Sequence, residues 1–117
     1  MKADLHTHTN FSDGKYKVEE LIDYAIYNNL NVLSITDHDT FDGVKLAATL
    51  NKPIDIIYGI ELSTYRNGES VHILGYFKSL KNIETMEPIL EEQILKRKTR
   101  AKKMLDLLKL HFNIELN

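Results

Sequence analysis

The chain has 117 residues, of which 43% are apolar and 27% are charged, and its formal net charge is −2. This length supports one modest hydrophobic core and excludes two domains, and the small negative charge excludes a general electrostatic attraction to nucleic acid. Cysteine is absent, which excludes disulfides and thiolate ligands, so imidazole and carboxylate groups must hold any bound metal.

The N-terminus predicts neither a signal peptide nor a membrane anchor. No apolar segment approaches the length that crosses a bilayer, and Lys2 and Asp4 interrupt the sequence before a signal-peptide core could form. We therefore expect a cytoplasmic protein without a membrane partner. Charge is unevenly placed, because six of the fifteen Lys and Arg residues lie between Lys96 and Lys103.

The first half of the chain predicts alternating strands and helices. In chain order we expect a strand over 2–6, a polar loop over 9–14, a helix over 18–28, a strand over 31–36, a helix over 42–50 and a strand over 54–60. This order is typical of an α/β fold with parallel strands and right-handed crossovers.

The second half predicts a hairpin and a long helix. Asn67-Gly68 separates two strand-like segments, 62–65 and 71–74, which is the pattern of a tight β-hairpin. Pro88 suits the first turn of a helix, so we expect a long helix to open near it. These elements leave an exposed edge on the parallel sheet, through which the chain could associate.

Metal-binding side chains lie where the predicted strands end. His6 and His8 alternate along the first strand, so both imidazoles can face one ion. Thr36-Asp37-His38-Asp39 ends the second strand, and Glu61 follows the third. Because parallel strands end at one edge of a sheet, we expect these groups to converge on a polynuclear metal site. Imidazole and carboxylate ligands suit hydrolytic Zn, Mn or Fe sites.

Five short motifs follow one another along the chain: His6-Thr7-His8, Ser12-Asp13-Gly14, Thr36-Asp37-His38-Asp39-Thr40, Gly59-Ile60-Glu61 and Val71-His72-Ile73. Together they resemble the polymerase and histidinol phosphatase (PHP) superfamily across essentially the whole chain. Within it, the chain looks most like stand-alone metal-dependent phosphoesterases similar to the 5′-to-3′ exoribonuclease and nucleoside 3′,5′-bisphosphate phosphatase branch.

The resemblance implies the N-terminal portion of a distorted (β/α)7 barrel with two or three divalent ions at its C-terminal mouth. The implied metal ligands are His6, His8, Asp13, His38, Glu61 and His72. Glu61 would bridge two ions, and His38 and Asp13 would serve a third, which makes these three residues the implied catalytic centre. The family completes its site with a further His and an Asp-x-His pair, so we expect residues 1–117 to be the N-terminal part of a single PHP domain.

Other residues have supporting roles in this interpretation. Asp4, Asp37 and Asp39 are expected to orient the imidazoles by accepting their remaining N–H groups. Arg97 and Arg100 offer forked donors for a substrate phosphate, whereas the alternative interpretation is a solvated helix face.

The function that the resemblance implies is metal-dependent hydrolysis of phosphate esters of nucleotides or short RNA 5′ ends. The expected partner is a small phosphorylated substrate, a nucleotide or a short oligoribonucleotide, and the isolated chain is expected to be inactive. Two alternatives stay open: a histidinol-phosphatase-like enzyme, and a non-catalytic, metal-stabilised PHP module of a DNA polymerase. A third is a folded, weakly metal-binding piece whose open edge is covered by association.

Overall fold

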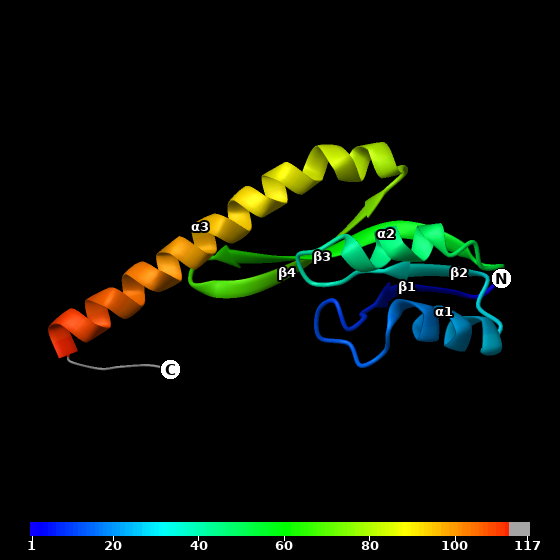
Figure 1. Cartoon of the computed structure of the whole chain (residues 1–117), viewed down its shortest axis with the longest axis horizontal. Helices are drawn as coiled ribbons and strands as arrows, with labels where there is room; N and C mark the ends of the chain where they lie inside the picture. Colours follow the sequence, from blue (N-terminus) through cyan, green and yellow to red (C-terminus); the bar gives the residue numbers. More distant parts are fainter. Residues whose placement is uncertain (113–117) are drawn as a thin grey trace.

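The computed structural model describes residues 1–112, and side chains are described except at 65, 66 and 108–112. The elements, in chain order, are β1 (Ala3–Thr7), α1 (Val18–Tyr27), β2 (Val32–Ile35), α2 (Asp42–Thr49), β3 (Asp55–Arg66), β4 (Glu69–Phe77) and α3 (Leu80–Phe112). The strands form one sheet in the order β1-β2-β3-β4, curled into a half-barrel with helices around it (Figure 1). No helix in the described range is both long and apolar enough to cross a membrane.

Strand pairing follows the predicted α/β pattern. β1 pairs with β2 and β2 with β3 in parallel, and β3 pairs with β4 in antiparallel fashion. The turn between β3 and β4 places Asn67 at φ 52° and Gly68 at φ 78°. Positive φ at both central residues is what a two-residue hairpin turn requires, so the predicted hairpin is confirmed.

The hydrophobic core lies between the helices and one face of the sheet. On α1, Val18, Ile22 and Ala25 are buried at the three-four spacing that places them on one side of a helix. The helix ends before Asn29, whose φ of 61° suits the left-handed position after a helix. The buried cluster consists of Val18, Ile22, Ala25, Leu33, Ile35, Phe41, Val44, Ala47, Ile60, Ile83 and Leu90. The opposite face of the sheet, which carries Glu61 and His72, is here called the open face.

Two predicted boundaries are wrong. The third strand does not stop before Glu61 but continues to Arg66, because no turn residue interrupts it and β4 supplies a new partner where β2 ends. The long helix begins at Leu80, and Pro88 lies inside it. Its first turn is held by Ser79, whose main-chain oxygen accepts the Asn82 N–H, and by Ile83, which is fully buried in the core. The C-terminal part of α3 extends beyond the sheet (Figure 1).

Candidate metal centre

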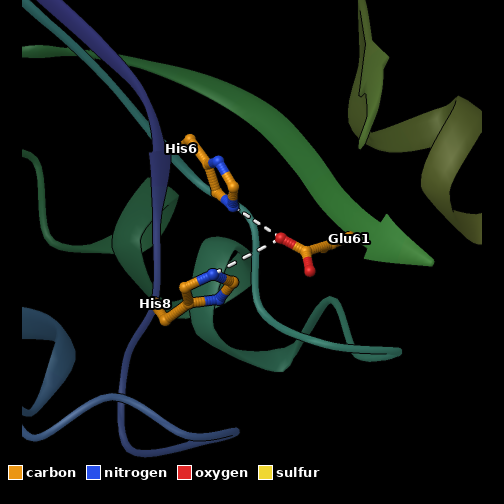
Figure 2. A group of neighbouring side chains, drawn as sticks. All are labelled: His6, His8 and Glu61. Atoms are coloured by element: carbon orange, nitrogen blue, oxygen red, sulfur yellow. Dashed lines mark hydrogen bonds and ion pairs between the residues drawn. The ribbon is translucent and has the colours of Figure 1, made fainter. Parts of the chain in front are cut away.

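His6 on β1 and His8, which directly follows that strand, meet the carboxylate of Glu61 on the open face. His6 Nε2 lies 2.5 Å and His8 Nε2 3.5 Å from the same oxygen, Glu61 Oε1 (Figure 2). The two histidine rings are 5.1 Å apart, centroid to centroid. The predicted convergence of these three side chains therefore occurs in the structure.

The register between β1 and β2 shifts by one residue around His6, as it does at a β-bulge. Asp4 pairs with Leu33 and Thr7 with Ile35, so three steps along β1 match two along β2. Bulges of this kind re-aim side chains and leave one residue without ladder bonds. The Leu5 carbonyl accepts a hydrogen bond from the Tyr76 hydroxyl of β4 at 2.6 Å. Tyr76 therefore ties the outer strand β4 to the bulge that carries His6.

Glu61 occupies the point where the parallel ladder between β2 and β3 resumes for one step. The Glu61 N–H donates to the main-chain oxygen of Asp37 at 3.1 Å, and the Asp39 N–H donates to the main-chain oxygen of Glu61 at 3.0 Å. This isolated bridge between His38 and Glu61 sets the two side chains next to each other. His38 Nδ1 lies 3.2 Å from Glu61 Oε2.

The hairpin brings His72 to the same carboxylate. His72 pairs directly with Ser63, two residues along β3 from Glu61, so His72 and Glu61 are diagonal neighbours on the open face. His72 Nδ1 lies 2.9 Å from Glu61 Oε2. One oxygen of Glu61 thus faces His6 and His8, and the other faces His38 and His72.

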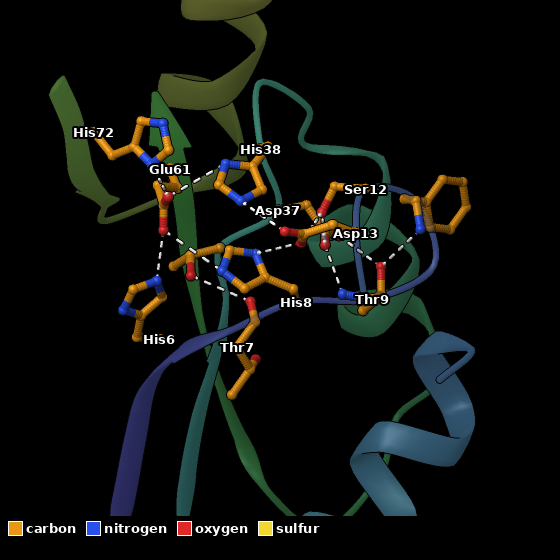
Figure 3. A network of polar contacts seen from close by, with 12 residues as sticks. His6, Thr7, His8, Thr9, Ser12, Asp13, Asp37, His38, Glu61 and His72 are labelled. Atoms are coloured by element: carbon orange, nitrogen blue, oxygen red, sulfur yellow. Dashed lines mark hydrogen bonds and ion pairs between the residues drawn. The ribbon is translucent and has the colours of Figure 1, made fainter. Parts of the chain in front are cut away.

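The loop after β1 delivers Asp13 to the far side of the cluster (Figure 3). Asp13 Oδ2 lies 3.2 Å from His38 Nε2, and Asp13 Oδ1 lies 3.7 Å from His8 Nδ1. The rings of His8 and His38 stack with centroids 4.6 Å apart. The loop folds back so tightly that a Cβ at Gly14 would lie 2.3 Å from the His8 carbonyl oxygen, so this position requires glycine.

Asp37 anchors that loop through its carboxylate. Its side chain is buried and accepts hydrogen bonds from the Thr9 N–H at 2.6 Å, the Thr9 hydroxyl at 2.6 Å and the Ser12 hydroxyl at 2.8 Å (Figure 3). A Cβ at Gly43 would lie 2.3 Å from Asp37 Oδ2, so α2 approaches the carboxylate closely only because residue 43 is glycine. Thr9 was not among the predicted site residues, and Ser12 entered the prediction only as part of the Ser12-Asp13-Gly14 motif.

The structure gives Asp4, Asp37 and Asp39 hydrogen-bond partners other than the imidazoles that they were expected to orient. Asp4 accepts the main-chain N–H of His6 at 3.1 Å, and Asp37 holds the loop. Asp39 accepts the main-chain N–H of Ser63 at 2.9 Å and pairs with Arg97 at 3.2 Å. Among the described residues, one nitrogen each of His6 and His72 and both nitrogens of His38 face Glu61 or Asp13. These three aspartates instead hold the backbone that carries the ligand side chains.

The carboxylates of the cluster favour their ionised form. Burial alone would raise the pKa of Glu61, but the hydrogen bond from His6 and the charges of His38, His6 and His8 outweigh it, so the pKa lies below its ordinary value. For Asp13, desolvation is likewise outweighed by the charges of His38 and His8, and its pKa is also lowered. Ionised carboxylates are the form that binds cations.

The donor set fits divalent ions. Three overlapping groups have ligand atoms within 4.8 Å of one another: His6, His8 and Glu61; His8, Asp13 and His38; His38, Glu61 and His72. Furthermore, His8 Nδ1 is buried and has no hydrogen-bond partner among the residues that the structure describes. A buried nitrogen left without a partner is costly, and a cation would satisfy its lone pair.

The family model of the PHP domain matches residues 4–117 of the chain. The chain belongs to this family. It is 37% identical over 102 residues to the 5′-3′ exoribonuclease of Haemophilus influenzae, covering 86% of this chain and 37% of that protein. It is 35% identical over 89 residues to the 3′,5′-nucleoside bisphosphate phosphatase of Chromobacterium violaceum, covering 74% of this chain and 30% of that protein.

A solved PHP-like structure shows the same arrangement of the backbone. An inferred metal-dependent phosphoesterase of Bifidobacterium adolescentis superposes with a TM-score of 0.71 at 29% identity, covering 98% of this chain and 41% of that one. The chain thus spans between 30% and 41% of the length of these three relatives. The observed half-barrel corresponds to part of a PHP-type barrel.

The two arginines with a predicted phosphate role lie on α3. Arg97 and Arg100 border a cavity of about 460 Å³ between α3 and the hairpin, whose other walls include Phe41, Leu62 and Met86. The Arg97 guanidinium is paired with Asp39, which directly follows His38. The structure therefore connects α3 to the metal centre through an aspartate.

Proposed function

We propose that the whole protein is a metal-dependent phosphoesterase that hydrolyses phosphate esters of nucleotides or of short RNA 5′ ends. The observation that carries the proposal is the sharing of one carboxylate, Glu61, between two groups of imidazole ligands. The relatives named as exoribonuclease and nucleoside bisphosphate phosphatase support the substrate class. Residues 1–117 would form the N-terminal part of the PHP domain, and ligands from the rest of the domain would complete the site.

In this proposal two or three divalent ions, Zn, Mn or Fe, are bound at the cluster. His6, His8 and Glu61 would hold one ion, Glu61 and His72 another, and Asp13 with His38 a third. When bound, such ions lower the pKa of water to near neutrality and offset the charge of phosphate oxygens. Glu61 can be shared because its two oxygens face different imidazoles, at 2.5 Å for His6 and 2.9 Å for His72.

The residues of the chain would divide the remaining tasks. The lowered pKa values of Glu61 and Asp13 keep both carboxylates ionised at neutral pH. Glu61 is almost fully buried, so its charge acts in a medium that screens it less than water does. Arg97 and Arg100 would contact a second phosphate or the RNA backbone, and Arg97 would exchange Asp39 for that phosphate.

The test is hydrolysis of 4-nitrophenyl phosphate and of a nucleoside 3′,5′-bisphosphate by the whole protein supplied with Mn²⁺. Glu61→Ala should abolish phosphate release from both esters, because it removes the ligand common to two groups. Glu69→Ala is the matched control, since Glu69 is an exposed carboxylate on the same hairpin. Unchanged turnover in Glu61→Ala would overturn the proposal, and metal uptake without any turnover by the wild type would favour a non-catalytic module.

A further inference from the structure

Asp39 adopts an unusual backbone conformation beside the metal centre. Its φ is 55°, in the left-handed region that a non-glycine residue enters at some cost, although Asp and Asn tolerate it best. The main-chain N–H of Asp39 still donates to the main-chain oxygen of Glu61, as a parallel ladder requires. After that bond the chain turns away from β3 toward α2, so the backbone ladder ends at Asp39.

The side chain of Asp39 continues the ladder that its backbone leaves. In a parallel ladder that pairs His38 with Glu61, the Glu61 N–H bonds residue 37, and the next N–H, that of Ser63, would bond the main-chain oxygen of residue 39. Because the chain turns away, Asp39 Oδ1 accepts the Ser63 N–H instead, at 2.9 Å. The carboxylate therefore takes the place of a backbone carbonyl.

The hydrogen bond from Ser63 to Asp39 lies next to two of the proposed metal ligands, Glu61 and His72. Ser63 lies two residues beyond Glu61 and pairs directly with His72. A donor at Ser63 without an acceptor would lose its hydrogen bond in a half-buried position. Among the described residues, the only main-chain pairing left between β3 beyond Tyr58 and the β2 side would then be the His38 bridge. The spacing of Glu61 and His72 relative to His38 then depends on Asp39.

We propose that Asp39 is a positioning residue, whose carboxylate extends the β2–β3 ladder by one side-chain hydrogen bond and thereby holds His38, Glu61 and His72 in register. The importance of that register for metal binding rests on the function proposed above. The pairing of Asp39 Oδ2 with Arg97 at 3.2 Å has a secondary role, since it orients the carboxylate from α3 without touching Ser63.

Three variants separate the acceptor from the ion pair and from the backbone conformation. Asp39→Asn keeps a side-chain oxygen for Ser63, tolerates positive φ and removes the charge that Arg97 faces. Asp39→Gly removes the acceptor and relieves the backbone, so it is free of the strain that Ala would add. Arg97→Met removes only the ion pair and is the matched control for loss of charge.

The first measurement is amide hydrogen exchange by NMR in the metal-free chain, comparing the Ser63 amide with the core amide of Leu33. In Asp39→Gly, the exchange of Ser63 should accelerate at least about 10-fold while Leu33 is unchanged, since only the local bond is lost. In Asp39→Asn and Arg97→Met, Ser63 exchange should stay within about 3-fold of the wild type.

The second measurement is Mn²⁺ affinity by calorimetric titration of the same proteins. Asp39→Gly should weaken Mn²⁺ binding by about 10- to 100-fold, as loss of a group supporting metal ligands generally does, whereas Asp39→Asn should restore it to near the wild-type value. The inference is overturned if Asp39→Gly leaves Ser63 exchange unchanged. It is also overturned if Asp39→Asn and Arg97→Met accelerate Ser63 exchange and weaken Mn²⁺ binding as much as Asp39→Gly does. A wild-type chain and whole protein that bind no Mn²⁺ would defeat the proposed function, while the exchange data would still decide the role of Asp39.

Discussion

Replacement of Asp37 by Ala should destabilise the metal-free chain severely. Asp37 is 1% exposed and Thr9 is 0% exposed, and the carboxylate accepts both the N–H and the hydroxyl of Thr9. Each buried donor left without an acceptor costs about 1–3 kcal/mol, so Asp37→Ala should lower the free energy of unfolding by about 2–6 kcal/mol. A central value of about 4 kcal/mol corresponds to a fall of about 12–20 °C in Tm for a chain of this size.

The assay for Asp37→Ala is urea and thermal unfolding by circular dichroism in the presence of EDTA, which removes any contribution from bound metal. Asp106→Ala is the control, because Asp106 is exposed on α3 and its removal should change stability by no more than about 0.5 kcal/mol. The loss of stability in Asp37→Asn should lie between those of Asp37→Ala and Asp106→Ala, since Asn keeps one acceptor oxygen but directs its NH₂ group at a donor of Thr9. A loss of under about 1 kcal/mol in Asp37→Ala would refute the reasoning.

Three further substitutions test other parts of the fold. Tyr76→Phe removes the hydrogen bond to the Leu5 carbonyl and should lower the free energy of unfolding by about 1 kcal/mol in urea titrations, with an unchanged value contradicting the tie. Gly14→Ala should weaken Mn²⁺ binding measured by calorimetry, because its Cβ would lie 2.3 Å from a main-chain oxygen; affinity equal to the wild type would show that the loop can shift. The hydrogen bond to Glu87 is the main cause that raises the pKa of Lys45 above 10.5, so this pair should stabilise the fold fully below pH 10.5 and lose its effect as pH rises through the folded-state pKa. Since Lys45 is 39% exposed, the effect is about 0.5 kcal/mol, and alkaline unfolding curves should show it in the wild type but not in Lys45→Gln.

The sequence predicted the elements and the convergence of the ligands because both follow from local periodicity. Alternation in β1 places His6 and His8 on one side, and the end of the parallel ladder places His38 beside Glu61. These relations need only the knowledge that the strands are parallel. Sequence spacing was therefore sufficient to bring His6, His8, His38 and Glu61 together, whereas Asp13 and His72 were placed by the family resemblance; the register shift in β1 was not foreseen.

The errors concern contacts between segments that are distant in the sequence. Pro88 was expected to open the long helix, but burial of Ile83 in the core stabilises an earlier turn, and this contact with distant parts of the chain is not visible in the sequence next to Pro88. The roles of Asp37 and Asp39 depend on donors that lie 28 and 24 residues away, Thr9 and Ser63. No sequence pattern distinguishes a carboxylate that supports an imidazole from one that supports a loop or a strand.

The most direct test of the central claim is an anomalous difference map from crystals of the chain grown with Mn²⁺. If the folded chain gathers imidazoles and carboxylates around shared ions, the map should show at least one peak within about 2.5 Å of a Glu61 carboxylate oxygen and of a His6, His8, His38 or His72 nitrogen. A map that shows fully occupied Mn²⁺ sites, all of them away from Glu61, would contradict the claim.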